Sequence, residues 1–234
     1  MRLHLLIKAY ITSFLLVLSC YCTAQNESGN NLENTSVSKT ENSTTKNFGP
    51  RWTLSIDGAI PITSGKKYMG LAMKGKSAYS FRGQLFLYKN FFWAFSFGRA
   101  DFETTDTEIV GNYKRTRVLH ETMYLGYEVL TTKSFKAGVQ MSIYGESQYR
   151  NKYNGSDEAY QRDSGRVRSY EAYLAYNFNK YISVNLIYAY RNDKMNIDTS
   201  PELESRFDKA QFHSIGLGLK FHFGTSDLIS AFTK

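Results

Sequence analysis

Residues 51–62 read RWTLSIDGAIPI, and apolar side chains alternate there with small or polar ones. Leu54 and Ile56 occupy even-numbered positions, whereas Ser55 and Asp57 occupy odd-numbered positions, and we call this alternation the parity of the strand. Successive side chains of a β-strand point to opposite faces. The stretch therefore predicts a strand with one apolar face and one polar face.

The same alternation recurs in eight segments between Arg51 and Phe223, and the connections between them are alternately long and short. This rhythm predicts an all-β fold, an eight-stranded antiparallel up-and-down transmembrane β-barrel. Its three short turns are predicted at Lys89–Asn90, Thr131–Ser134 and Asn179–Lys180. Its four long loops are predicted at Thr63–Lys76, Glu103–Lys114, Asn151–Gly165 and Asn192–Lys209.

The even number of strands predicts a sidedness for the barrel. An even count places both termini and the short turns at one end, which in bacterial barrels of this type is the periplasmic end. The four long loops are then extracellular, and we expect the protein to reside in the cell outer membrane of a Gram-negative envelope. The barrel domain is predicted to span residues 50–224.

The N-terminus predicts export. Residues 1–24 have basic side chains at Arg2 and Lys8, then an apolar run, then small residues, as in a secretory signal peptide. Cleavage after Ala24 would remove both cysteines. In the alternative, the stretch from Val17 to Cys20 resembles a lipoprotein cleavage box, in which Cys20 would be lipidated.

Two polar segments flank the predicted barrel. Residues 25–49 consist largely of Asn, Ser, Thr, Glu and Lys, which bury too little apolar surface to order a chain. We expect a disordered periplasmic leader there. Residues 225–234 are predicted to form a C-terminal tail.

The basic charge predicts an anionic partner. The full chain carries a net charge of +8, and loss of Arg2 and Lys8 with the signal peptide leaves +6. In an exported barrel this favours outer-membrane lipid and lipopolysaccharide over nucleic acid. The expected lipopolysaccharide contacts are Lys66, Lys67, Lys74, Lys76, Arg115, Arg117, Arg166 and Arg168.

Strand parity also predicts a charged interior. The inward-facing ionisable residues form a polar and salt-bridge cluster of Asp57, Arg82, Glu128, Lys136, Glu171 and Lys220. Glu128 and Lys136 flank one short turn and are expected to meet. The same parity places Tyr144 and Glu146 inside. We interpret the cluster as a structural plug, because eight strands leave an interior that side chains fill; an ion gate is the alternative.

Parity argues against a catalytic triad. His120 and Ser214 are predicted to point inward from opposite walls, His213 outward, and His222 inward at the periplasmic end. No catalytic residue, cofactor-binding residue or metal ligand is therefore predicted, and no cofactor is expected.

The last predicted strand reads Gly218-Leu219-Lys220-Phe221-His222-Phe223, a glycine followed by two spaced aromatic residues. With this closing strand and the eight-strand pattern, the chain resembles the OmpA/OmpX-like eight-stranded outer-membrane β-barrel family, which is porin-like. The resemblance implies assembly by the barrel-assembly machinery. It departs from the family at Gly224–Lys234, which continues beyond the terminal aromatic residue.

The resemblance implies a function class. The expectation is a monomeric, non-enzymatic barrel with a structural, envelope-integrity or surface-interaction role carried by its four extracellular loops. Two alternatives remain: an outer-leaflet enzyme that modifies lipid A, and a small-solute channel.

Overall fold

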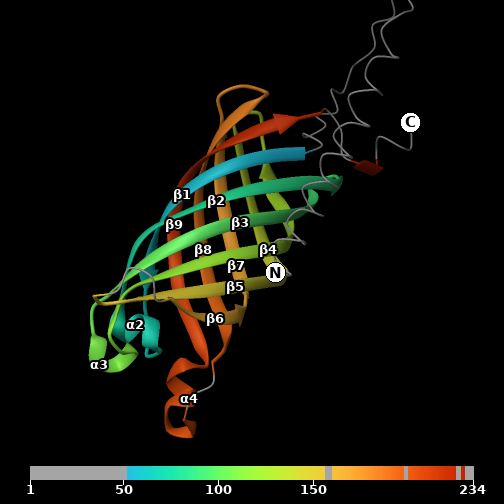
Figure 1. The fold of residues 1–234 in the computed structure, drawn as a ribbon. Coiled ribbons are helices and arrows are strands. Elements are labelled where there is room, and N and C mark those ends of the chain that lie inside the picture. Colours follow the sequence, from blue (N-terminus) through green and yellow to red (C-terminus); the bar gives the residue numbers. More distant parts are fainter. Residues whose placement is uncertain (1–51, 156–159, 198–199, 225–227, 230–234) are drawn as a thin grey trace, which may run out of the picture. The chain divides into compact units, whose positions relative to one another are not determined.

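The computed structural model describes residues 52–155, 160–197, 200–224 and 228–229 (Figure 1). The predicted signal peptide, the polar leader and the tail, apart from residues 228–229, lie outside the described residues. No helix in the described part of the chain is long and apolar enough to cross a membrane. In chain order the elements are β1 (Trp52–Thr63), α2 (Tyr68–Ala72), β2 (Met73–Tyr88), β3 (Phe91–Thr104), α3 (Thr107–Val110), β4 (Tyr113–Thr131), β5 (Phe135–Tyr153), β6 (Tyr160–Arg166), β7 (Ser169–Asn177), β8 (Ile182–Asn196), α4 (Pro201–Phe207) and β9 (Lys209–Phe223).

The strands form one closed antiparallel sheet. Apart from β6 and β7, strands that are neighbours in sequence pair with each other, as β4 does with β5, and β9 pairs back onto β1. The segments β6 and β7 lie end to end, because both pair with β5 on one side and with β8 on the other. Together they form a single barrel strand, so the predicted eight-stranded antiparallel barrel is confirmed.

The strands are staggered around the barrel. Following the register partners from Trp52 through each strand in turn leads back to β1 at Ile62, ten residues further along the same strand. A stagger of this kind tilts the strands against the barrel axis. An eight-stranded barrel has an interior only wide enough for its own side chains.

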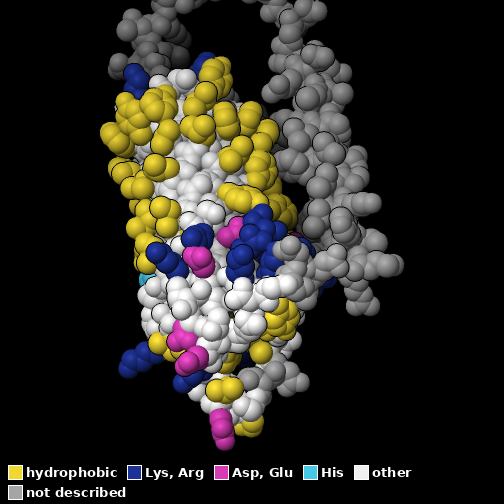
Figure 2. All heavy atoms as spheres, turned by 60° about the vertical axis from the view of Figure 1, so that its left-hand side comes forward, with side chains coloured by type: hydrophobic (Ala, Val, Ile, Leu, Met, Phe, Trp, Pro, Cys, Tyr) yellow, Lys and Arg dark blue, Asp and Glu magenta, His cyan; other side chains and the backbone are white. Residues whose placement is uncertain are grey.

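The two ends of the barrel differ. The terminus end is where β1 begins, β9 ends and the three short turns lie, and the loop end carries α2, α3 and α4 (Figure 1). Large apolar side chains such as Ile56, Phe81, Leu125 and Val139 are exposed on the outside of the strands. Figure 2 shows them as a band toward the terminus end, with charged side chains beyond the band toward the loop end.

A bulge changes the parity of β5. The pairing register between β4 and β5 shifts by one residue at Ile143. Beyond the shift Tyr144 and Glu146 are exposed, while Gly145 and Ser147 are buried. The prediction that Tyr144 and Glu146 point inward is therefore wrong, because a bulge inserts one extra residue into a strand and reverses which side chains face inside.

The strands extend further toward the loop end than predicted. In the predicted loop Asn151–Gly165, β5 continues to Tyr153 and β6 begins at Tyr160. In the predicted loop Asn192–Lys209, β8 continues to Asn196. Beyond the apolar band the outer face of these strands is polar, so the sequence shows no apolar alternation there.

Apolar side chains close the barrel at the loop end. Helix α2 turns inward, so that Tyr68, Met69 and Ala72 are buried. They pack with residues from several strands, and we call this cluster the loop-end plug. Its buried members are Tyr68, Met69, Ala72, Met73, Ala100, Phe102, Val110, Val118, Tyr149, Met195, Ala210 and Phe212.

A second buried cluster lies nearer the terminus end. It contains several aromatic rings, among them Phe92, whose ring lies 5.5 Å from that of Phe86 and 6.3 Å from that of Tyr173. We call it the aromatic layer. Its members are Phe86, Phe92, Ala94, Tyr124, Tyr173, Ala175 and Ile187.

Candidate functional site

A buried ion pair crosses the interior between β2 and β7. Arg82 Nη1 lies 2.7 Å from Glu171 Oε2. The hydroxyl of Tyr124 donates to Glu171 Oε1 at 2.7 Å, and Gln140 Nε2 donates to Oε2 at 2.7 Å. Ser169 Oγ adds a bond of 3.2 Å. These donors offset the cost of removing the carboxylate from water.

Asp57 of β1 faces the same region of the interior. Its carboxylate accepts hydrogen bonds from Ser55 Oγ at 3.0 Å, from Ser80 Oγ at 3.5 Å and from Asn185 Nδ2 at 3.4 Å. A Cβ added at Gly218, the register partner of Asp57, would lie 2.0 Å from Asp57 Oδ1. The carboxylate therefore fills space that a side chain on β9 would need.

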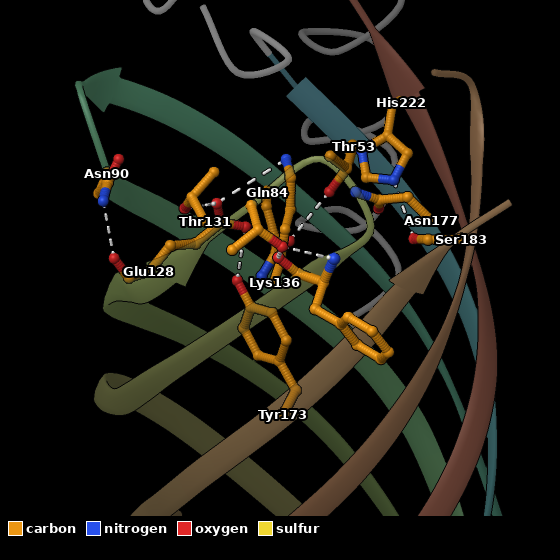
Figure 3. A network of polar contacts seen from close by, with 12 residues as sticks. Thr53, Gln84, Asn90, Glu128, Thr131, Lys136, Tyr173, Asn177, Ser183 and His222 are labelled. Atoms are coloured by element: carbon orange, nitrogen blue, oxygen red, sulfur yellow. Dashed lines mark hydrogen bonds and ion pairs between the residues drawn. The ribbon is translucent and has the colours of Figure 1, made fainter. Parts of the chain in front are cut away.

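A further polar network lies near the terminus end (Figure 3). Lys136 Nζ lies 3.8 Å from Glu128 Oε2, so the structure brings together the two residues that flank the short turn. Tyr173 and Thr131 donate their hydroxyls to Glu128 at 3.0 Å and 3.2 Å. Lys220 Nζ lies 3.9 Å from the centre of the Tyr173 ring. Side chains from four strands thus cross this end of the barrel.

Sequence reasoning missed one interior ion pair. Arg191 donates through Nε and Nη2 to the two carboxylate oxygens of Asp193, at 2.8 Å and 2.7 Å, and Tyr149 donates its hydroxyl to Oδ2 at 2.6 Å. The sequence places Asp193 in the predicted loop Asn192–Lys209, whereas it lies on β8 and is fully buried. Continuing the parity of β8 beyond the apolar band would have found it.

The interior charges are balanced among the described residues. Four carboxylates and four cations of the strands are buried. Six of these residues are the predicted interior cluster, and Arg191 and Asp193 complete the set. The buried charged residues are Asp57, Glu128, Glu171, Asp193, Arg82, Lys136, Arg191 and Lys220.

A small cavity is lined by the Arg82–Glu171 ion pair and by Ala100 and Phe212 of the loop-end plug. Its volume is about 70 Å³, and Arg82, Glu171, Arg191, His120 and Ser214 are among the residues that line it. Arg82 Nε and His120 Nδ1 are buried without a hydrogen-bond partner in the described protein. Several polar groups in a lining that is otherwise mostly apolar, together with a volume of this order, suit a few bound water molecules.

His120 of β4 and Ser214 of β9 both line this cavity, from strands on opposite walls of the barrel. A triad also needs a carboxylate to orient the imidazole. Within the described residues, no carboxylate bonds to any of the three histidine rings: the unpartnered Nδ1 atoms belong to His120 and His222, and His213 Nδ1 bonds to the Tyr188 hydroxyl at 2.7 Å. No group of three or more potential metal ligands occurs among the described residues either.

The predicted lipopolysaccharide contacts fall into two groups, those that form an ion pair with another described residue and those that do not. Lys67 Nζ forms an ion pair of 2.7 Å with Asp208, and Lys76 Nζ forms one of 2.7 Å with Glu103. Arg117 Nε lies 3.2 Å from the Asp101 carboxylate. In the described part of the chain the other predicted contacts form no ion pair; they are Lys66, Lys74, Arg115, Arg166 and Arg168.

The comparisons with known proteins concern the fold. No family model matches the chain, and no curated protein matches it. Among solved structures, Neisserial surface protein A is similar with a TM-score of 0.51 at 8% identity, over 74% of this chain and 97% of that chain. Ail of Yersinia pestis is similar with a TM-score of 0.46 at 11% identity, over 75% of this chain and 100% of that chain. OprG of Pseudomonas aeruginosa reaches a TM-score of 0.47 at 14% identity, over 75% and 99%. Neisserial surface protein A is an eight-stranded outer-membrane β-barrel of the OmpA/OmpX type, and this chain shares its fold.

Proposed function

We propose that this chain is a non-enzymatic outer-membrane barrel whose interior does not conduct, and which supports the envelope or meets other molecules through its loop end. One observation carries the proposal. The interior is filled along its length by the network of Figure 3, the aromatic layer, the buried ion pairs and the loop-end plug.

The filled interior argues against a channel. A conducting pore needs a continuous aqueous path, and the cavity of about 70 Å³ lies between two apolar clusters. The buried charges, four of each sign among the described residues, give ions of neither sign an advantage. The structural plug is therefore favoured over an ion gate.

The arrangement of the histidines argues against a lipid-modifying enzyme. His120 lies in the interior, away from the lipid-facing surface, and no carboxylate orients it among the described residues. His222 is bonded to Ser183 at 2.9 Å in the buried network at the terminus end (Figure 3). A lipid substrate would reach neither group without opening the barrel.

The outside of the barrel supports the outer-membrane location. A closed sheet leaves no unpaired strand edge, and the exposed apolar band provides a surface for lipid chains. In this proposal the terminus end is periplasmic and the loop end extracellular. The partners are membrane lipid, lipopolysaccharide and, during assembly, the barrel-assembly machinery, and the barrel acts as a monomer.

Planar-bilayer recording tests the closed interior. We expect the purified, folded chain to give no discrete conductance steps in 1 M KCl at roughly 100 mV, because side chains block the path. A large diffusion porin, inserted under the same conditions, is the positive control. Reproducible steps of one size from the folded chain would refute the proposal.

A further inference from the structure

Three arginines lie side by side on the outside of the barrel toward the loop end. Arg117 of β4 is the register partner of Arg150 of β5, and Arg150 is in turn the partner of Arg162 of β6. Directly opposed residues of antiparallel strands point to the same face. Thr116 and Asn151 beside them are buried, so the arginines face outward.

A second row of cations continues around the barrel. Arg166 of β6 is the register partner of Lys194 of β8, and Lys194 is the partner of Lys209 of β9. Arg162 and Arg166 share one face of β6, because they are four residues apart on a strand. The two rows therefore join into one surface, the basic arc, across five strand segments. The basic arc consists of Arg117, Arg150, Arg162, Arg166, Lys194 and Lys209.

The basic arc is electrostatically unfavourable in the isolated chain. Like charges directly opposed across a strand pair destabilise a sheet. In the described part of the chain, Arg117 is the one member that forms an ion pair, at 3.2 Å from Asp101. Glu146 is the register partner of Arg166, but the two form no ion pair. A bound anion with several charges would relieve this repulsion.

The position of the basic arc relative to the apolar band indicates what the anion is. On β8 the outward-facing residues run from Tyr190 to Lys194 of the basic arc, a separation of four residues. On β7 and β6 they run from Tyr170 to Arg166, which is also a separation of four residues. Four residues of a tilted strand rise about 10 Å along the barrel axis. With Tyr170 and Tyr190 taken as the edge of the apolar band, the cations lie at or just beyond the outer limit of a lipid headgroup layer, which is about 5–8 Å deep.

We propose that the basic arc binds the multiply phosphorylated headgroup of a membrane lipid whose phosphates stand away from the acyl chains, as in lipopolysaccharide. This rests on the proposed function, because the apolar band has to lie in the membrane. Arginine suits the role, since its guanidinium forms paired hydrogen bonds with phosphate oxygens. The site lies on β4, β5, β6, β8 and β9, and the lysines of the β1–β2 connection are outside it.

Thermal unfolding of the full chain in lipid vesicles tests the site. The variant is R150Q/R162Q, and the control K133Q/K180Q removes two cations from turns at the terminus end. In phosphatidylcholine, we expect R150Q/R162Q to be at least as stable as wild type, because opposed charges are gone. When lipopolysaccharide is added, the unfolding temperature of wild type and control should rise, and R150Q/R162Q should lose at least half of that rise. If R150Q/R162Q does not fold, R166Q/K194Q from the second row replaces it.

Three results would overturn the proposal. If lipopolysaccharide raises the unfolding temperature of R150Q/R162Q as much as that of wild type, the arginines are not part of the binding site. If phosphatidylglycerol raises the unfolding temperature of wild type as much as lipopolysaccharide does, the effect is due to surface charge alone. An equal rise with inorganic phosphate in phosphatidylcholine vesicles would indicate a site for a free anion. None of these results would alter the conductance test, so the two proposals fail separately.

Discussion

At the scale of single residues, burial decides what an ion pair contributes. Arg82–Glu171 and Lys76–Glu103 have the same separation of 2.7 Å, but the side chains of the first pair are 7% and 5% exposed and those of the second are 56% and 51% exposed. Removal of one buried partner leaves an uncompensated charge in a medium of low dielectric constant. Water and salt screen the exposed pair.

We therefore predict different costs for the two carboxylates. Glu171→Ala should lower the free energy of unfolding by about 3–5 kcal/mol, because Arg82 loses its partner. Glu103→Ala should lower it far less, because water and salt already screen this exposed pair. Urea unfolding of both variants in the same vesicles measures the difference. Similar losses in the two variants would contradict a tightly packed interior.

The interior residues differ in how far the sequence reveals them. Asp57, Arg82 and Glu171 occupy inward positions within regular apolar alternation, so their parity identifies them. Asp193 lies beyond the apolar band, where the outward residues are also polar, and Tyr144 follows a bulge. Alternation in the sequence identifies the inward-facing residues only where the outward-facing residues are apolar and no bulge interrupts the strand.

At the scale of elements, the bulge in β5 determines which side chains in the half of this strand toward the loop end face the barrel interior. Ile143 is the extra residue, and it is 54% exposed. Beyond it Ser147, Tyr149 and Asn151 face the interior. Tyr149 reaches Asp193 and belongs to the loop-end plug, so the plug depends on this bulge.

Deletion of Ile143 should abolish folding, whereas Ile143→Ala should fold. The deletion restores a regular strand and turns the buried residues beyond it toward the outside. The substitution changes one exposed side chain and keeps the register. Folding is measured by the heat-dependent shift of the barrel in gel electrophoresis. A folded deletion variant would show that β5 can change register without loss of the barrel.

The loop-end helices were not predicted. Helix α2 has five residues, too few for a helical apolar period to be recognised in sequence. Its burial depends on contacts with distant segments: Tyr68 stacks on Phe207 with ring centres 5.1 Å apart, and Lys67 pairs with Asp208. Closure of the loop end is therefore a tertiary property.

At the scale of the whole molecule, the ends of the barrel are chemically distinct. The terminus end has short turns next to the apolar band, whereas the loop end extends beyond the band with charged strands and the short helices α2, α3 and α4 (Figures 1 and 2). This asymmetry supports a single orientation in the membrane, with the loop end outside.

Cysteine labelling in intact cells tests the orientation. A membrane-impermeant maleimide should label Leu203→Cys in α4 without permeabilisation, because the proposed orientation places that end outside. Lys133→Cys, in a turn at the terminus end, should be labelled only after the outer membrane is opened. The unsubstituted chain controls for Cys20 and Cys22. The reverse pattern would invert the orientation.

The fold class, the strand number and most of the apolar band can be predicted from the sequence alone. These follow from local alternation and connection length, which need no knowledge of distant contacts. Only the folded barrel shows the loop-end plug, the pairing of Arg191 with Asp193 and the basic arc. Each depends on which residues of different strands become register partners, and that is fixed only when the sheet closes with its stagger and its bulge.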